Sequence, residues 1–285
     1  MRFFRLIRTM LIRALCVTSL RIPTRNKISY VNPKQRSSIR FRAIKNKLLS
    51  YKGTGPVGPA KYWEYPWALV NGRLFWHGRL KILDAGCGRS PVQFLLAELK
   101  NEVHGIDPFE NVEWHGIDRS LMKNFGVNIT YKVEGMETIS YPDNTFDRVF
   151  CLSVIEHCRA GSVAMKDNVL FKEGLSPQTK ADRKLQAQMM REMVRVLKPG
   201  GLLIVTVDFT LPQEEFFLEA NVDVKNLIEN ADGASLLTPP SHRNFYGYDG
   251  FDLESIKKDP SVEIIHYAGL HSTAVGFVLK KVSNV

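Results

Sequence analysis

The chain has 285 residues, of which 44% are hydrophobic, and it carries a formal net charge of +10. A chain of this length and hydrophobic content can bury a core, as one ordinary domain with extensions or at most as two small domains. The chain has four cysteines, Cys16, Cys87, Cys151 and Cys158, and no two of them form a C-x-x-C pair. This spacing argues against a disulfide framework and against a zinc site. We therefore expect reduced thiols in an intracellular protein, and no metal.

The positive charge is concentrated at the N-terminus. Fifteen Lys and Arg residues precede Glu64, which is the first acidic residue. The rest of the chain has 24 basic against 29 acidic residues, a net charge of −5. A mildly acidic main body argues against an extended nucleic-acid surface there. We therefore predict a basic arm and linker at residues 1–59 and one folded domain at residues 60–285.

Residues 3–17 have the pattern of an amphipathic helix, with apolar side chains on one side of a helical wheel, arginines on the other, and Ile12 out of place. Arginines interrupt every apolar stretch close to the length of a membrane span, so we expect no span here. Three interpretations stay open: contact of residues 1–20 with a membrane surface, an organellar transit peptide, or a helix packed on its own domain. We expect a cytoplasmic protein, which the first interpretation would place at a membrane surface. A transit peptide would instead place the protein in the mitochondrion or another organelle.

Residues 22–60 contain scattered basic residues, Pro23, Pro33 and a Gly-Pro-rich stretch at 53–59. This composition predicts a solvated linker with one short helix near Phe41–Tyr51. RNA binding by the arm is the alternative, and it is disfavoured because few aromatic residues are interleaved for base stacking.

Aromatic residues are concentrated at positions 62–76, just before the first predicted strand. Large aromatic side chains dominate core burial, so we expect these rings to pack a helix against a sheet. At least one of them is expected to cover a binding site at the adjacent glycine-rich turn.

The glycine-rich turn follows an apolar run and precedes a helical pattern. Gly86 and Gly88 permit unusual backbone angles and a close approach of a ligand to the main chain. Ser90 is expected to cap the helix and Pro91 to be its first residue. The next predicted strand ends at Asp107, whose carboxylate can accept both hydroxyl protons of a ribose. The implied ligand carries a nucleoside.

The remaining apolar runs predict further strands and helices. Predicted strands lie at 128–133, 146–153, 202–206, 262–267 and 274–281, and predicted helices at 118–125, 184–197 and 253–258. The polar stretch at 159–183 is predicted to be a lid over a bound substrate or a plain surface insertion. A second predicted loop begins near Thr206 and contains Asp208. Ligands bind at the carboxyl ends of the strands in open α/β sheets, so both loops are expected near the site.

Three blocks, in this order, resemble the motifs of class I S-adenosylmethionine-dependent methyltransferases with a type 11-like domain. They are Asp84-x-Gly86-x-Gly88, then 142–157 with its Pro-Asp-Asn-Thr-Phe-Asp segment, then 195–206 with its Pro-Gly-Gly turn. The resemblance implies an α/β, Rossmann-like fold with a seven-stranded, mostly parallel sheet, a C-terminal antiparallel hairpin and helices on both faces. Ser90 stands where many members have a third glycine.

The resemblance also implies S-adenosyl-L-methionine as the cofactor. In the family the acid at Asp84 orients the methionine end, the glycines pass beneath the cofactor, and the acid at Asp107 holds the ribose. An acid that binds the adenine amino group is usual where this chain has Gly135, so Glu134 or Glu137 could supply that acceptor, with Met136 against the ring. The predicted cofactor-binding residues are Asp84, Gly86, Cys87, Gly88, Asp107, Met136, Glu137 and Ser153.

Glu156 and His157 follow the fourth predicted strand and are the predicted catalytic residues. The ordinary pKa of histidine, about 6.5, suits accepting a proton from a methyl acceptor, and Glu156 would orient the ring. The alternative is that His157 caps a helix or bonds a loop carbonyl.

We predict transfer of a methyl group to an oxygen or nitrogen atom of a small-molecule acceptor. One alternative is methylation of RNA or protein recruited by the basic arm, although a nucleic-acid partner is disfavoured. Another is a cofactor-binding assembly factor without catalysis. A nicotinamide-dependent enzyme fits poorly because the glycine spacing differs from the dinucleotide pattern.

Overall fold

The computed structural model describes residues 29–30, 33–55, 58–74, 79–112, 116–160, 179–211, 222–237, 258, 262–267 and 270–282. The predicted amphipathic segment at 3–17 lies outside this part, as does the predicted helix at 253–258 apart from Lys258. Most of the predicted lid or insertion also lies outside it. In the part of the chain that is described, no helix is long and apolar enough to cross a membrane.

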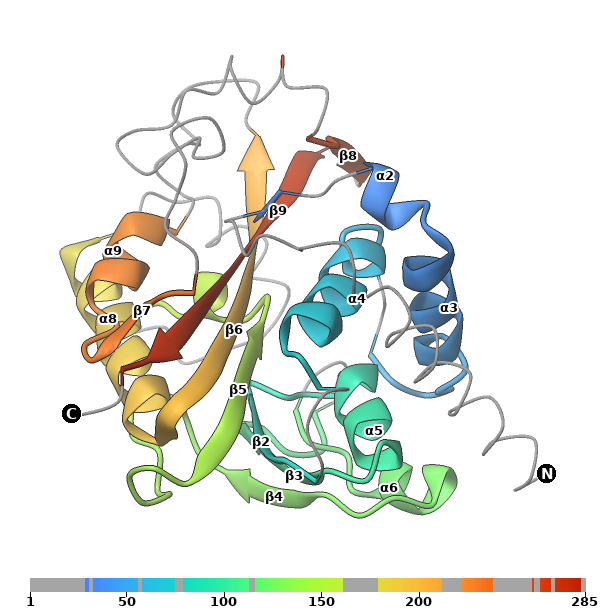
Figure 1. Cartoon of the computed structure of the whole chain (residues 1–285), viewed down its shortest axis with the longest axis horizontal. Coiled ribbons are helices and arrows are strands. Elements are labelled where there is room, and N and C mark those ends of the chain that lie inside the picture. The colour runs from blue at the N-terminus through green and yellow to red at the C-terminus, as the bar shows by residue number, and fades with distance from the viewer. Residues whose placement is uncertain are drawn as a thin grey trace.

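Helices and strands alternate through most of the described chain (Figure 1). The helices are α2 (Pro33–Arg36), α3 (Ile39–Leu48), α4 (Lys61–Asn71), α5 (Pro91–Glu98), α6 (Ser120–Phe125), the 3-10 turn η1 (Ile155–His157), α8 (Lys180–Arg195) and α9 (Val224–Glu229). The strands are β1 (Ser29–Tyr30), β2 (Lys81–Ala85), β3 (Glu102–Asp107), β4 (Thr130–Val133), β5 (Phe146–Leu152), β6 (Leu197–Leu211), β7 (Ala234–Leu236), β8 (Ile265–Tyr267) and β9 (Leu270–Lys281).

The strands form one sheet in the order β1-β9-β6-β5-β2-β3-β4, and β7 and β8 also pair with β9. Neighbours from β4 to β6 run parallel, whereas β9 is antiparallel to β6 and to the three short strands along its other edge. Parallel neighbours need long crossover connections, and α5, α6 and α8 lie in such connections. The predicted Rossmann-like architecture with its C-terminal antiparallel hairpin is confirmed. The short strands β1 and β7 were not predicted.

Helices cover both faces of the sheet, with α3, α4 and α5 on one side and α8 and α9 on the other (Figure 1). Successive strand residues enter different cores, as Ile82 and Leu83 of β2 show. Both are fully buried, as expected for a central strand with two covered faces. The carboxyl ends of β2, β3, β5 and β6 therefore lie along one edge of the sheet, between the two helical layers.

The helix predicted near Phe41–Tyr51 exists as α3, but it packs on the folded body instead of lying in a solvated linker. Phe41, Ile44 and Leu48 are buried in the same core as α4 and α5. Lys47, only 4% exposed, forms an ion pair with Glu98 of α5 at 2.5 Å. The apolar spacing within the arm thus gives α3 a core-facing side. The domain boundary at residue 59 stays a prediction.

Several element boundaries differ from the prediction, and two of them have a clear structural cause. Helix α8 begins at Lys180, earlier than predicted, because Thr179 and Asp182 form a reciprocal capping box. Strand β6 continues to Leu211, so Asp208 lies in a strand and pairs with Ala274 of β9. Pairing with β9 keeps this stretch extended beyond Thr206.

Candidate active site

The glycine-rich turn after β2 is held by the neighbouring strand. The backbone N–H groups of Gly86 and Cys87 both donate to the Ile106 carbonyl, at 2.9 and 3.0 Å. Gly86 has φ of 72°. A Cβ on Gly86 would lie 2.4 Å from Cγ1 of Val154, so both conformation and space require glycine. Ser90 caps α5 by accepting from the Val92 N–H at 3.3 Å, as predicted.

Two carboxyl groups lie at the ends of β2 and β3. Asp107 accepts hydrogen bonds from the Gly88 and Phe109 N–H groups, each at 3.0 Å. Burial raises its pKa, and these two donors partly oppose the rise. Asp84 is only 2% exposed, and its Oδ2 has no hydrogen-bond partner among the described residues. Burial, followed by the nearby charge of Asp107, raises the pKa of Asp84 to about 7.

Three other predicted cofactor residues occupy different environments. Cys87 is buried, so its backbone rather than its thiol belongs to the turn. Met136 is 4% exposed and lies in the α8-side core, where its sulfur is 3.9 Å from the Cys151 thiol. Glu137 is half-buried, and its carboxylate lies over Gly135 and close enough to affect the pKa of Cys158. Glu137 is therefore better placed than Met136 to meet a ligand at the strand ends.

Ser153 directly follows β5 and has a strained conformation. Its φ of 52° falls in the left-handed region that non-glycine residues rarely adopt. Its N–H donates to the Thr206 carbonyl at 2.9 Å, and its Oγ donates to Oε2 of Glu64 at 2.8 Å. Strain of this kind persists where surrounding contacts determine the backbone, and it concentrates at functional sites.

A cluster of charged groups lies beside Ser153, which we call the acid–lysine cluster: Lys61, Glu64, Glu156 and Asp208. Lys61 Nζ contacts Glu64 Oε2 at 2.8 Å and Asp208 Oδ2 at 3.2 Å. Glu156 Oε1 accepts from the Asp208 N–H at 2.8 Å. Glu64 is fully buried and Glu156 is 9% exposed, whereas the Asp208 side chain keeps 38% of its surface exposed. The cluster is thus buried at its base and open at Asp208.

The carboxyl groups of the cluster differ in their affinity for protons. Burial and the charge of Asp208 raise the pKa values of Glu64 and Glu156 to about 8. Burial alone would raise the pKa of Asp208, but Lys61, a hydrogen bond with Glu64 and the charge of His157 outweigh it and lower that pKa. Burial lowers the pKa of Lys61, but Asp208 and Glu64 overcome this and raise it well above its ordinary value. At neutral pH we therefore place protons on Glu64, Glu156 and Lys61, and a negative charge on Asp208.

The predicted catalytic pair separates in the structure. His157 is exposed on η1, while the neighbouring Glu156 points into the buried cluster and holds the backbone of Asp208. The charge of His157 acts on Asp208. The sequence prediction that Glu156 orients His157 therefore stays a prediction, and Asp208 is the carboxylate whose pKa responds to the ring.

The match of the chain to known sequences agrees with this geometry. Residues 77–230, more than half of the chain, match the methyltransferase domain family. The chain belongs to this family. The matched region contains the glycine-rich turn, η1 and β6, so it includes the carboxyl ends of all the strands that carry the site.

Three known proteins illustrate the range of similar methyltransferases. The ubiquinone biosynthesis O-methyltransferase of Methylocella silvestris is 38% identical over 79 residues, which cover 27% of this chain and 30% of that protein. The tRNA U34 carboxymethyltransferase of Nautilia profundicola is 31% identical over 99 residues, covering 34% and 31%. The Burkholderia thailandensis 1,6-didemethyltoxoflavin-N1-methyltransferase, solved with 1,6-didemethyltoxoflavin and S-adenosylhomocysteine, aligns with a TM-score of 0.45 and 14% identity over 77% of this chain and 79% of that one. The matches span about a third of the length of the two sequence relatives.

The residues of this domain fit the predicted cofactor. Among the described residues the buried Oδ2 of Asp84 lacks a donor, which an ammonium group such as that of a methionine moiety would supply. A Cβ built on Gly88 would make only ordinary van der Waals contacts, with its nearest neighbours at 3.8 Å or more. The turn therefore offers both an unsatisfied carboxylate and room for a ligand against its backbone.

Sequence reasoning missed two members of the acid–lysine cluster, Lys61 and Glu64. Both lie in the first turns of α4, the helix in which only the aromatic residues were given a role. One signal was present, because a Lys and the first acidic residue of the chain stand three positions apart in an otherwise apolar helix. The rings themselves pack as expected, with Trp63 and Trp67 stacked at 5.4 Å in the core.

Proposed function

We propose that this methyltransferase transfers a methyl group from S-adenosylmethionine to an oxygen or nitrogen atom of a small-molecule acceptor. The observation that carries the proposal is the acid–lysine cluster, which places three carboxyl groups at the ends of β5 and β6, beside the glycine-rich turn. Membership of the methyltransferase domain family supports the cofactor.

The cofactor half of the site is formed by Asp84, Gly86, Gly88 and Asp107. Asp84 would bind the ammonium of the methionine moiety, and Asp107, already oriented by two backbone donors, would accept from the ribose hydroxyls. When bound, the sulfonium supplies an already activated methyl group. The protein therefore needs to align the acceptor, exclude water and remove one proton.

The acceptor half favours a group that donates hydrogen bonds. Asp208 is ionised and its side chain keeps 38% of its surface exposed, so its carboxylate can accept a hydrogen bond from a ligand. A hydroxyl or amine would donate that bond, whereas a carboxylate or phosphate would be repelled by Asp208.

We assign proton removal to His157, with Asp208 as its electrostatic partner. The exposed ring can reach a ligand, and the ionised Asp208 would stabilise the imidazolium that forms. Glu156 supports this arrangement by holding the Asp208 backbone, and Lys61 keeps Asp208 ionised.

The proposal is tested first by titration calorimetry of the full chain with S-adenosylmethionine and, separately, NADH. We expect binding of the first alone, lost in Asp84→Ala. S-adenosylhomocysteine release is then measured with panels of hydroxyl, amine, RNA and protein acceptors. His157→Gln and Asp208→Asn should each lower turnover about 100-fold with cofactor affinity changed less than about threefold. Loss of cofactor binding in these two variants would contradict the assignment of His157 and Asp208 to the acceptor half of the site.

The tRNA-modifying relative keeps RNA methylation as the second candidate. It predicts turnover on RNA together with salt-dependent RNA binding that requires the basic arm. Cofactor binding without turnover on any acceptor would support a non-catalytic assembly factor instead.

A further inference from the structure

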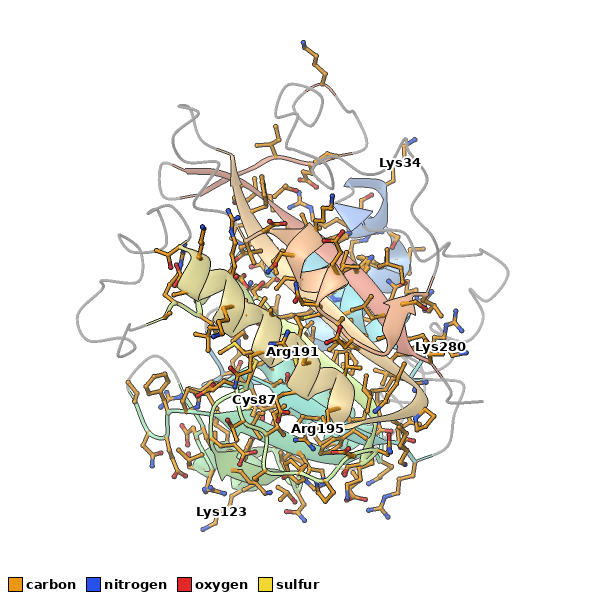
Figure 2. The ribbon with its side chains drawn as sticks, turned by 90° about the vertical axis from the view of Figure 1, so that its left-hand side faces the viewer. Lys34, Cys87, Lys123, Arg191, Arg195 and Lys280 are labelled. Atoms are coloured by element: carbon orange, nitrogen blue, oxygen red, sulfur yellow. The ribbon has the colours of Figure 1, made fainter. Side chains whose placement is uncertain are left out.

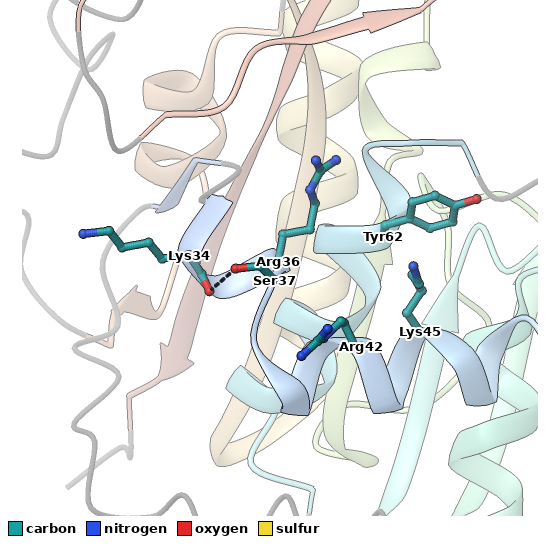
Figure 3. A pocket seen from close by; sticks show the side chains of 6 residues that line it. All are labelled: Lys34, Arg36, Ser37, Arg42, Lys45 and Tyr62. Atoms are coloured by element: carbon teal, nitrogen blue, oxygen red, sulfur yellow. Dashed lines mark hydrogen bonds between the residues drawn. The ribbon is translucent and has the colours of Figure 1, made fainter.

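A basic hollow lies on the face of the molecule formed by α2, α3 and the first turn of α4. It has a volume of about 670 Å³ and is lined by Lys34, Arg36, Ser37, Arg42, Lys45 and Tyr62. Figure 3 shows that these side chains come from α2, α3, the turn between them and the first turn of α4, and that Lys34 points away from Lys45 and Tyr62. This surface is separate from the acid–lysine cluster, although Tyr62 follows Lys61 in α4.

Three of the four cationic side chains that line the basic hollow have no ion-pair partner among the described residues. Arg36 pairs with Glu263. Lys34, Arg42 and Lys45 form no ion pair with any carboxylate in the part of the chain that the structure describes. The ammonium of Lys45 instead lies over the ring of Tyr62, 4.9 Å from its centroid. Like charges gathered in this way repel one another, and an external anion would remove that cost.

The N-terminus of α3 adds to the preference of the hollow for anions. The N-terminus of a helix carries partial positive charge, and acidic side chains in the first turn usually offset it. Helix α3 has no acidic residue in its first turn. The ten-residue α3 begins at Ile39, directly after Ser37 and its cap Ser38. Helix polarity and side-chain charge therefore act in the same direction.

One exposed apolar side chain at the hollow favours a membrane over other polyanions as the binding partner. Ile39 is 68% exposed at the start of α3, between Arg36 and Arg42. A basic surface around a protruding aliphatic residue suits a membrane interface, where the charges meet phosphate groups and the aliphatic group enters the acyl boundary. Nucleic acid would instead favour exposed aromatic rings for stacking. Of the described lining residues only Tyr62 is aromatic, and Lys45 already lies over its ring.

We propose that the basic hollow and Ile39 form a docking surface for an anionic phospholipid membrane, with lipid phosphates held by Lys34, Arg42 and Lys45. The acid-free, arginine-rich sequence of residues 3–17 is consistent with the same partner, and two weak membrane signals together give firmer attachment than one. The inference does not depend on the methyl acceptor or on catalysis.

The test is co-sedimentation of the full chain with vesicles of phosphatidylcholine, with or without phosphatidylglycerol. We expect binding only to the anionic vesicles, weakened by salt. Lys34→Glu/Arg42→Glu changes two exposed side chains and should reduce that binding about tenfold or more. Lys123→Glu/Lys184→Glu makes the same charge change elsewhere and should have a much smaller effect. Figures 1 and 2 place Lys123 of α6 at the opposite end of the molecule from Lys34.

Further arms of the experiment distinguish a membrane from nucleic acid and from free phosphate. Ile39→Ser should weaken vesicle binding about threefold while leaving its salt dependence unchanged, because it removes apolar insertion and no charge. Thermal unfolding of each variant confirms that it is folded. Equal vesicle binding by wild type and Lys34→Glu/Arg42→Glu would overturn the proposal. So would tighter binding to RNA, or to inorganic phosphate in solution, than to anionic vesicles.

Discussion

The two halves of the site are built in different ways. The proposed cofactor half comes from one continuous segment, residues 84–107, in which backbone conformation and two carboxylates would hold the cofactor. The acceptor half combines α4, η1 and β6, and Lys61 and Asp208, which meet there, are 147 positions apart. The first half depends on local geometry and the second on charges brought together by packing. Backbone changes should therefore damage the first, and changes of charge should damage the second.

The largest effect is expected from Lys61→Met in the acceptor half. This change leaves Glu64 and Asp208 without the cation that contacts them, and breaking a buried pair costs about 3–5 kcal/mol in unfolding free energy. The loss should be larger at pH 8 than at pH 5.5, because the carboxyl groups can take up protons at the lower pH. Urea unfolding at both pH values measures it.

Lys81→Met is the matched control for that substitution. Lys81 pairs with Glu102 at 3.0 Å, but their side chains are 33% and 46% exposed. An exposed pair contributes about 1 kcal/mol or less. Similar losses in both variants would mean that the acid–lysine cluster is no more stabilising than a surface ion pair.

Gly86→Ala should damage the cofactor half. The new Cβ would overlap Val154 at 2.4 Å, and φ of 72° would be strained. We expect a loss of about 2–4 kcal/mol in unfolding free energy and at least about tenfold in cofactor affinity. Gly126→Ala separates the two causes, since φ is 64° there and nothing lies within 4 Å. It should cost about 1 kcal/mol. Equal costs would show that overlap with Val154 is unimportant.

Asp84→Asn should stabilise the ligand-free protein while abolishing cofactor binding. The pKa of Asp84 is raised to about 7, so the wild type loses stability as pH rises from the unfolded value through that folded value. The variant lacks this loss, and its stability relative to wild type should increase by about 2 kcal/mol between pH 5.5 and pH 8. Unfolding curves at both pH values test the gain in stability, and cofactor titrations test the loss of binding.

Asp232→Asn, which alters an exposed carboxyl group, is the control for that pH dependence. It should leave both the pH profile and the affinity unchanged. If Asp84→Asn lowers stability at pH 8, the ionised Asp84 carboxylate is stabilised by a partner in the folded protein, and the assignment of an unsatisfied acid is wrong.

The smallest effect concerns Ser153, where the two halves meet. Ser153→Ala and Ser153→Gly both remove the hydrogen bond to Glu64, but only glycine relieves the positive φ of 52°. The glycine variant should therefore unfold with a free energy about 1 kcal/mol higher than the alanine variant. Equal stability of the two would mean that the backbone at Ser153 stores no strain.

Much of the cofactor half could be predicted because its causes are local. The glycine conformations, the Ser90 cap and Asp84 lie within a few residues of one another, and Asp107 ends the next strand along the chain, so residue types and spacing predict the arrangement. The same reasoning failed at β6, which was predicted to end near Thr206. Its extension to Leu211 depends on pairing with β9, far away in the chain. It also failed at α3, whose burial depends on surfaces of α4 and α5 that only the folded chain presents.

The sequence by itself determined the parallel sheet, the glycine-rich turn and the acids at the ends of two strands. Tertiary structure decided which groups share the acceptor half and what charge each carries. Glu64 has a pKa of about 8 because burial removes water and brings Asp208 close, and neither condition is visible in the residues around it. Charge interactions and desolvation depend on distance in space, which a linear spacing does not specify.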